Sequence, residues 1–381
     1  MGATVFNIIR KVEHLSWPGP QDFVLDELQA VSSDLVARQP NWSLYSLDLM
    51  ANLAWFVEMP DEFDLSASAF AFIDQHSHAR RVLRLSLDDL IEVAARIPPP
   101  PHVIFVFNIG RCGSTLVSHI LNSSPRVWGL SEPVAFPQMI QQNYNSDHRL
   151  QYPGGRLVEL IRSCTRLLFR PPQGAGKDVF AVKFHSQCLF QADLYQQAFP
   201  EASFVFLYRD ALDWTKSWYQ MARKYGFPAA ASGQEKTAIW NTITAADDLA
   251  KLRPYVDIEA EQVAMEDGLV IGWARNIEEY DRLLRGGVPF LALRYDELNR
   301  DRAASLAHLF EHCGLTRQEA IAGLSAFDRD SQAGMMVSHD VVAESLTDDQ
   351  VTRLRRVLAR HPRYGDPGYR VADVYSMAKA D

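Results

Sequence analysis

The spacing of apolar residues divides the chain into two parts. Up to about residue 97 the apolar positions recur near a helical period. In segment 22–36 these positions are Phe23, Leu25, Leu28, Val31 and Leu35. Segments 43–57 and 87–97 are amphipathic in the same way. We therefore predict a helical N-terminal region over residues 1–97. Four successive prolines at 98–101 end this region and are expected to form a stiff, extended joint.

From residue 102 onward, short apolar runs alternate with helical segments. The runs that predict strands are 103–107, 126–130, 179–184, 203–208 and 289–295. This alternation is typical of an α/β fold with a parallel sheet flanked by helices, which we expect over residues 102–335. Residues 226–285 are predicted to be a helical insertion that covers an acceptor site, with helices at about 234–253 and 259–285. Residues 336–381 are predicted to form a C-terminal helical extension.

The loop between the first of these strands and the following helix is a candidate anion site. A glycine-containing loop that leads into a helix directs backbone N–H groups to one point at the positive end of the helix dipole. A Walker A loop needs a Lys before its hydroxyl residue, and this loop has none. The candidate binding residues in it are Gly110, Arg111, Cys112, Gly113, Ser114 and Thr115. Cys112 is interpreted as a small residue that fits a tight loop.

The other strand ends also carry polar residues. Glu132 follows the second strand, and Pro133 is expected to hold it in an extended conformation. Lys183 and His185 end the third strand, and Arg209 ends the fourth. Because the carboxyl ends of parallel strands share one edge of a sheet, these side chains are expected at the edge where ligands bind.

The two anion-binding features together resemble those of the sulfotransferases that use 3′-phosphoadenosine 5′-phosphosulfate (PAPS). Residues 111–115 resemble the 5′-phosphosulfate loop of the branch that has Arg where cytosolic members have Lys. Arg209, with Ser217 eight residues later, resembles the pair that binds the 3′-phosphate. The resemblance spans about 102–335 and implies a P-loop-like fold, PAPS as co-substrate, 3′-phosphoadenosine 5′-phosphate (PAP) as product, and no metal.

The resemblance also suggests roles for further residues. Lys183 and His185 resemble the family's strand-end Lys-x-His, in which the His is the general base, whereas other branches use a Glu. Both His185 and Glu132 therefore remain open as the base, with Lys183 and Arg111 stabilising the leaving phosphate. Tyr295 begins a segment similar to the Tyr-Glu-Asp near the adenine. The family's Arg-Lys-Gly segment has no counterpart at 331–334, so the residues that close over the 3′-phosphate are unassigned.

Composition narrows the class of protein. The 381 residues are 47% hydrophobic and 22% charged, as in soluble globular proteins. A net charge of −9 and the lack of a basic stripe argue against nucleic-acid binding. The four cysteines are far apart, which favours a reducing compartment. We find no apolar segment that could span a membrane and no signal peptide, so we expect a cytoplasmic protein.

Several alternatives stay open from the sequence. A P-loop kinase or nucleotide hydrolase is one, and a non-catalytic binding protein on the same fold is another. The acceptor is not indicated: a small molecule, a glycan or a peptide would each fit. The N-terminal region is open to roles in shaping the acceptor pocket, forming a homodimer or docking a partner. His308 and His312 lie four residues apart on one predicted helix face, which we interpret as solvated rather than as a metal site.

Overall fold

The computed structural model divides the chain into two compact units. The first unit comprises Met1–Val106 and Val117–Ser203, and the second comprises Phe107–Leu116 and Phe204–Asp381. The structure describes residues 2–12, 18–143, 152–170, 176–234, 236–237, 252–257, 259–329, 331 and 344–377. Most of the helix predicted at 234–253 and of the polar segment at 331–334 lies outside the described residues.

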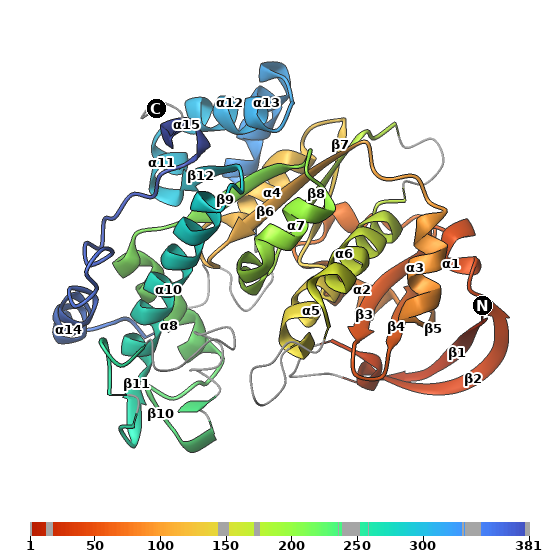
Figure 1. Ribbon diagram of the computed structural model, residues 1–381, viewed down its shortest axis with the longest axis horizontal. Coiled ribbons are helices and arrows are strands. Elements are labelled where there is room, and N and C mark those ends of the chain that lie inside the picture. Colours follow the sequence, from red (N-terminus) through yellow and green to blue (C-terminus); the bar gives the residue numbers. More distant parts are fainter. Residues whose placement is uncertain are drawn as a thin grey trace. The chain divides into compact units, whose positions relative to one another are not determined.

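The N-terminal region is built on a sheet, so the prediction of a helical region over residues 1–97 was wrong. Five antiparallel strands pair in the order β2-β1-β5-β4-β3 (Figure 1). They are β1 (Gly2–Lys11), β2 (Phe23–Ser32), β3 (Trp42–Asp48), β4 (Leu53–Glu58) and β5 (Arg81–Ser86). The helices are α1 (Leu35–Arg38), α2 (Ala71–His78) and α3 (Leu87–Ala95), and only α3 matches a predicted helix.

The reason for this error is visible in β2. Leu28, which a helix would have placed on its buried face, is 46% exposed, and Val24 is 37% exposed. Strand pairing with residues distant in sequence therefore prevails over a loose helical period.

Residues from 102 onward form the predicted α/β fold. The second sheet has five strands in the order β12-β9-β6-β8-β7. They are β6 (His102–Asn108), β7 (Val127–Ser131), β8 (Val179–Lys183), β9 (Ser203–Tyr208) and β12 (Phe290–Arg294). The registers β6/β8, β7/β8 and β9/β12 are parallel. The apolar runs of β6, β8 and β9 are buried, as expected for central strands of a parallel sheet.

Helices follow the strands of this sheet along the chain (Figure 1). In the first unit they are α5 (Ala135–Asn143), α6 (Gly154–Leu168) and α7 (Ala192–Ala198), together with most of α4 (Ser114–Asn122). In the second unit, α8 (Ala211–Lys224) follows β9, α11 (Tyr295–Arg300) follows β12, and α12 (Arg302–His312) and α13 (Arg317–Gly323) come next.

The predicted insertion is not entirely helical. Two short antiparallel strands, β10 (Ala230–Ser232) and β11 (Gln262–Ala264), precede the long helix α10 (Met265–Arg285). The predicted C-terminal helical extension contains α14 (Asp348–Leu358), which Thr347 caps, and a short α15 (Val374–Met377).

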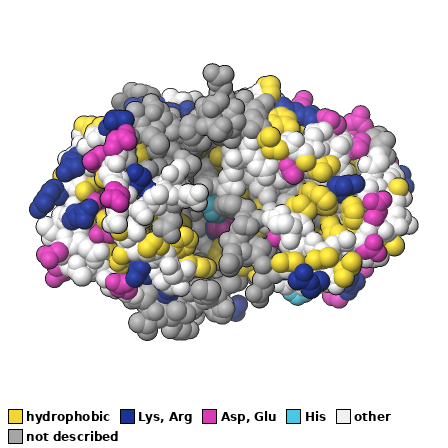
Figure 2. All heavy atoms as spheres, turned by 90° about the horizontal axis from the view of Figure 1, so that it is seen from below, with side chains coloured by type: hydrophobic (Ala, Val, Ile, Leu, Met, Phe, Trp, Pro, Cys, Tyr) yellow, Lys and Arg dark blue, Asp and Glu magenta, His cyan; other side chains and the backbone are white. Residues whose placement is uncertain are grey.

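Charged side chains of both signs occur on the face of the molecule seen in Figure 2. On the face seen in Figure 2, the Lys and Arg side chains of the described residues are interspersed with Asp and Glu side chains. On that face they do not gather into a stripe of one sign. Among the described residues, no helix is both long enough and apolar enough to span a bilayer.

Candidate active site

The predicted site residues fall into two groups, one in each unit. All nine predicted cofactor-binding residues belong to the second unit, whereas Glu132, Lys183 and His185 belong to the first.

The glycine loop of the second unit is anchored to β9 by its backbone. Asn108 Oδ1 accepts a hydrogen bond from the backbone N–H of Gly110 at 2.8 Å. Both the backbone N–H of Ile109 and the thiol of Cys112 donate to the carbonyl of Leu207, each at 3.3 Å. Cys112 is fully buried, so its small thiol packs the loop against the sheet.

Three residues of this loop adopt left-handed backbone conformations. The φ angles are +71° at Gly110, +48° at Arg111 and +78° at Gly113. Glycine adopts such angles without strain, but Arg111 does so at a cost of roughly 1 kcal/mol or more. Left-handed residues in a tight loop turn backbone N–H groups toward one side, as in concave anion-binding loops, and α4 begins immediately after this loop.

Aromatic rings cover both glycines. A Cβ atom on Gly110 would lie 2.7 Å from Cζ2 of Trp218, and one on Gly113 would lie 2.5 Å from Cδ2 of Tyr295. The indole Nε1 of Trp214 donates to the carbonyls of Ile109 at 3.0 Å and Gly110 at 2.9 Å. Only glycine fits at these two positions, since any side chain would displace a ring.

The two arginines singled out from the sequence lie in this part of the second unit. Nε of Arg111 donates to Oγ of Ser217 at 3.1 Å, and the guanidinium of Arg209 lies 4.8 Å from the ring centroid of Tyr295. Burial lowers the pKa of Arg111, and the nearby positive charge of Arg209 lowers it further. Two guanidinium groups that oppose each other in this way favour a multiply charged anion between or beside them.

Two buried donors in the same region have no hydrogen-bond partner among the described residues. They are Nε of Arg209 and the indole Nε1 of Trp218. An unsatisfied buried donor costs about 1–3 kcal/mol, so such groups suit a site that a polar ligand completes.

The first unit contributes a buried ion pair at the ends of β7 and β8. The ammonium of Lys183 is 3% exposed and donates to the carboxylate of Glu132, while the backbone N–H of Glu132 donates to the carbonyl of Lys183 at 2.7 Å. In the sheet register, Lys183 stands beside Ser131 on one side and Val106 on the other.

The backbone of Glu132 differs from the prediction. Its φ is +53°, a left-handed rather than an extended conformation, so the expectation drawn from Pro133 was wrong. The bond from its N–H to Lys183, together with the ion pair, holds this conformation against the local preference.

His185 lies just beyond the end of β8. It caps a short 3₁₀ helix, Ser186–Gln191, where the N–H of Gln187 donates to its Nδ1 at 3.5 Å. Burial is the main factor that lowers the pKa of the imidazole; Glu132 raises it and Lys183 lowers it. A lowered pKa favours the neutral imidazole, the form that a general base requires.

Sequence reasoning did not assign a role to Trp214, Trp218 or Arg294. The two tryptophans are four residues apart and share a face of α8, but no sequence pattern indicates that this face covers a glycine loop about one hundred residues earlier. Arg294 precedes the predicted Tyr295 and resembles any polar residue at a strand end.

Together, the fold and this arrangement define a class: an α/β protein with a strand–loop–helix element of the kind that suits a phosphate group, and with an arginine at the end of another strand. The sequence model of the sulfotransferase family matches residues 101–319, which is more than half of the 381 residues. The chain therefore belongs to the sulfotransferase family and is an enzyme that transfers sulfuryl groups.

Solved structures of low sequence identity resemble the chain. A sulfotransferase from Alicyclobacillus acidocaldarius is 14% identical (TM-score 0.38; 68% of this chain and 93% of that chain are covered). The sulfotransferase domain of the Synechococcus PCC 7002 olefin synthase is 13% identical (TM-score 0.35; 72% and 98%). Retinol dehydratase in complex with androsterone and the inactive cofactor PAP is also 13% identical (TM-score 0.36; 71% and 84%). A search of curated protein sequences gave no match.

Proposed function

We propose that this enzyme transfers the sulfuryl group of PAPS to a hydroxyl or amine of a small acceptor. The observation that carries the proposal is the hydrogen bond from Arg111 to Ser217, because it joins the glycine loop to the helix that follows Arg209. One nucleotide with phosphates at both ends then has cationic groups and amide donors within a single compact unit.

The glycine loop is proposed to hold the 5′-phosphosulfate. The acceptor oxygen or nitrogen forms a bond to sulfur, the bond from sulfur to the 5′-phosphate oxygen breaks, and the acceptor proton passes to a base. Negative charge develops on the departing phosphate, and loop N–H groups and Arg111 would stabilise it. Arginine is a poor proton donor, so Arg111 would stabilise this charge without protonating the phosphate. Lys183 is the candidate to complete the stabilisation of the departing phosphate.

Arg209 and Ser217 are proposed to bind the 3′-phosphate, with Tyr295 near the adenine. The unpartnered Nε of Arg209 supports this role, since a guanidinium can offer a phosphate two parallel donors. Ser217 would exchange its bond with Arg111 for one to the ligand. The described residues contain no cluster of three or more potential metal ligands, and the scheme uses none.

Binding of nucleotides tests the co-substrate. We expect PAP to bind more tightly than ATP in calorimetry, and [35S]PAPS to label a product when acceptor mixtures are screened and analysed by mass spectrometry. Tighter binding of ATP than of PAP would instead favour a kinase or nucleotide hydrolase. Binding of PAP without label transfer to any acceptor class would favour a non-catalytic protein.

The base is proposed to be His185 or Glu132, and matched Gln variants of each decide between them. Loss of the base should lower kcat/KM by about 10²-fold or more. If His185 is the base, wild-type kcat/KM falls as the pH drops through a pKa below the usual 6.5, and the His185→Gln variant loses this acid limb. If Glu132→Gln lowers activity only by disturbing Lys183, that variant keeps the acid limb of the pH profile. Full activity in both variants would remove both assignments.

We further propose a cytoplasmic location, residues 102–335 as the catalytic domain, and acceptor selection or homodimer contacts as roles of the N-terminal sheet. The four cysteines, which are buried and form no disulfide, support a reducing compartment.

A further inference from the structure

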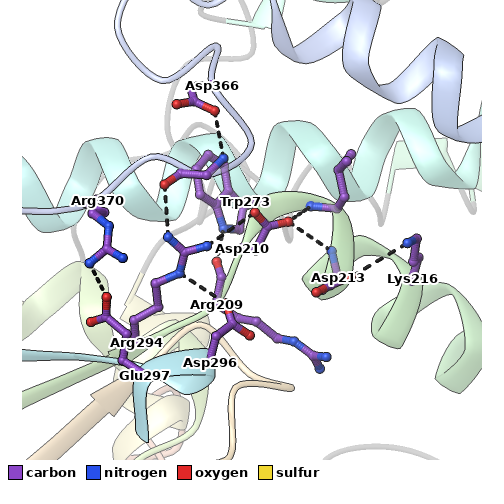
Figure 3. Close-up of polar contacts among 12 residues, drawn as sticks. Arg209, Asp210, Asp213, Lys216, Trp273, Arg294, Asp296, Glu297, Asp366 and Arg370 are labelled. Atoms are coloured by element: carbon purple, nitrogen blue, oxygen red, sulfur yellow. Dashed lines mark hydrogen bonds and ion pairs between the residues drawn. The ribbon is translucent and has the colours of Figure 1, made fainter. Parts of the chain in front are cut away.

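Arg209 is followed directly by an acidic residue, Asp210, which could neutralise it. The carboxylate of Asp210 is instead fully engaged elsewhere. Its Oδ1 accepts from the backbone N–H of Leu212 at 2.9 Å and of Asp213 at 3.3 Å, which caps α8. Its Oδ2 forms an ion pair with Nη2 of Arg294 at 3.4 Å (Figure 3).

Arg294 is held in place by three separate groups. Besides Asp210, its Nε donates to Oδ2 of Asp296 at 3.1 Å and its Nη1 donates to the carbonyl of Gly368 at 3.0 Å. Its side chain is only 12% exposed, so these bonds form in a poorly solvated place where ionic contacts are strong.

The C-terminal segment 366–370 forms hydrogen bonds with both α8 and Arg294. The carbonyl of Pro367 accepts from the N–H of Ala211, the first residue of α8, at 3.0 Å. The N–H of Gly368 donates to Oδ1 of Asp366 at 2.9 Å, and Arg370 pairs with Glu297. The start of α8 and the guanidinium of Arg294 are therefore both bound to one short segment, of which Figure 3 labels Asp366 and Arg370.

The contacts of Arg209 differ from those of Arg294. Its carbonyl accepts from the indole Nε1 of Trp273 at 2.8 Å, which fixes its backbone. Its side chain runs away from Asp210 and Arg294 (Figure 3) to lie over Tyr295, and its Nε has no partner among the described residues. Of these two arginines, one binds the carboxylate of Asp210 and the other lies against the ring of Tyr295.

We propose that Arg294 is a positioning residue that binds Asp210 and thereby keeps Arg209 available for the 3′-phosphate of the nucleotide. This inference rests on the proposed function. Without Arg294, the carboxylate next to Arg209 would be unpaired on one oxygen. It would oppose the phosphate and compete with it for the guanidinium.

The test compares two nucleotides that differ only in the 3′-phosphate, PAP and adenosine 5′-phosphate. We expect Arg294→Gln to weaken PAP binding about three- to tenfold and adenosine 5′-phosphate binding less than twofold. Asn replaces Asp well as a helix cap, so Asp210→Asn keeps α8 in place and removes the competing charge. The double variant should therefore recover most of the PAP affinity. Arg282→Gln, which breaks the pair between an exposed arginine and Glu279, is the matched control.

The possible outcomes distinguish a failure of the positioning role from a failure of the proposed function. Equal weakening of both nucleotides by Arg294→Gln, or no recovery in the double variant, would overturn the positioning role while leaving PAP as the ligand. A wild-type enzyme that does not prefer PAP to adenosine 5′-phosphate would overturn the proposed function, and the inference with it. If the Arg294 variant fails to fold, Asp210→Asn alone decides: PAP affinity should be unchanged or higher, and a loss contradicts the inference.

Discussion

At the scale of single residues, the site depends on positions that tolerate no side chain. Gly113 combines a left-handed φ of +78° with the close approach of Tyr295, whose Cδ2 would lie 2.5 Å from an added Cβ. The same ring lies against the guanidinium of Arg209. A change at Gly113 should therefore reach the proposed 3′-phosphate residue through Tyr295.

We predict that Gly113→Ala weakens PAP binding at least tenfold, because the ring of Tyr295 must move away from Arg209. Gly314→Ala is the matched control: its φ is +65° but nothing lies within 4 Å of the added Cβ. Both variants should lose about 1 kcal/mol of unfolding free energy through backbone strain, and only the first should change affinity. Calorimetric titration with PAP and urea denaturation measure the two quantities. Unchanged affinity in Gly113→Ala would contradict the role given to Tyr295.

At the scale of elements, helix α5 completes the edge of the N-terminal sheet. β3 is an edge strand, and its outward backbone groups find side chains instead of another strand. Oε1 of Gln138 accepts from the N–H of Leu47 at 2.7 Å, and its Nε2 donates to the carbonyl of Pro18 at 2.7 Å. Gln142, one turn later, accepts from the N–H of Leu49 and donates to the carbonyl of Leu47.

Substitution of Gln138 by Leu should lower the unfolding free energy by about 2–5 kcal/mol, since two buried backbone groups lose their partners. Gln141→Leu, on the same helix, breaks only a contact to the side chain of Gln187 and should cost less than about 1 kcal/mol. Denaturant unfolding measures both. PAP affinity of the folded protein should be the same in the two variants, because α5 contains none of the proposed nucleotide-binding residues. Equal loss of unfolding free energy in the two variants would show that the contacts of Gln138 to the sheet edge add no more stability than the contact of Gln141.

The elements also show where sequence reasoning succeeds. β9 was predicted at the residues it occupies, and β6, β8 and β12 to within one or two residues, because a short run of β-branched and aromatic residues is unambiguous. The N-terminal strands were mistaken for helices, because their alternation is interrupted and their partners are distant in sequence. The left-handed backbone conformation of Glu132 also depends on a distant residue, since Lys183, which holds it, lies fifty-one residues away.

At the scale of the whole molecule, every proposed cofactor-binding residue lies in one compact unit. That unit combines a short early segment, 107–116, with the chain from residue 204 onward. Nucleotide binding should therefore join segments far apart in sequence while leaving the N-terminal sheet unaffected.

We predict that saturating PAP slows amide hydrogen exchange in peptides covering 107–116 and 208–218. Strands β1 to β5 should exchange at unchanged rates, because a bound ligand stabilises the part that it contacts. Mass spectrometry of exchanged peptides, with and without PAP, measures this. Protection confined to the N-terminal sheet would contradict the assignment of the nucleotide site.

The sequence by itself determined the parallel α/β fold, the glycine loop and the identity of the charged residues at the strand ends, because each is encoded within a few adjacent positions. Only the tertiary structure decided that two tryptophans and a tyrosine cover the loop, that Arg294 rather than Arg209 pairs with Asp210, and that the N-terminal region is a sheet. Those outcomes depend on contacts between residues far apart in the chain, whose geometry no local pattern carries.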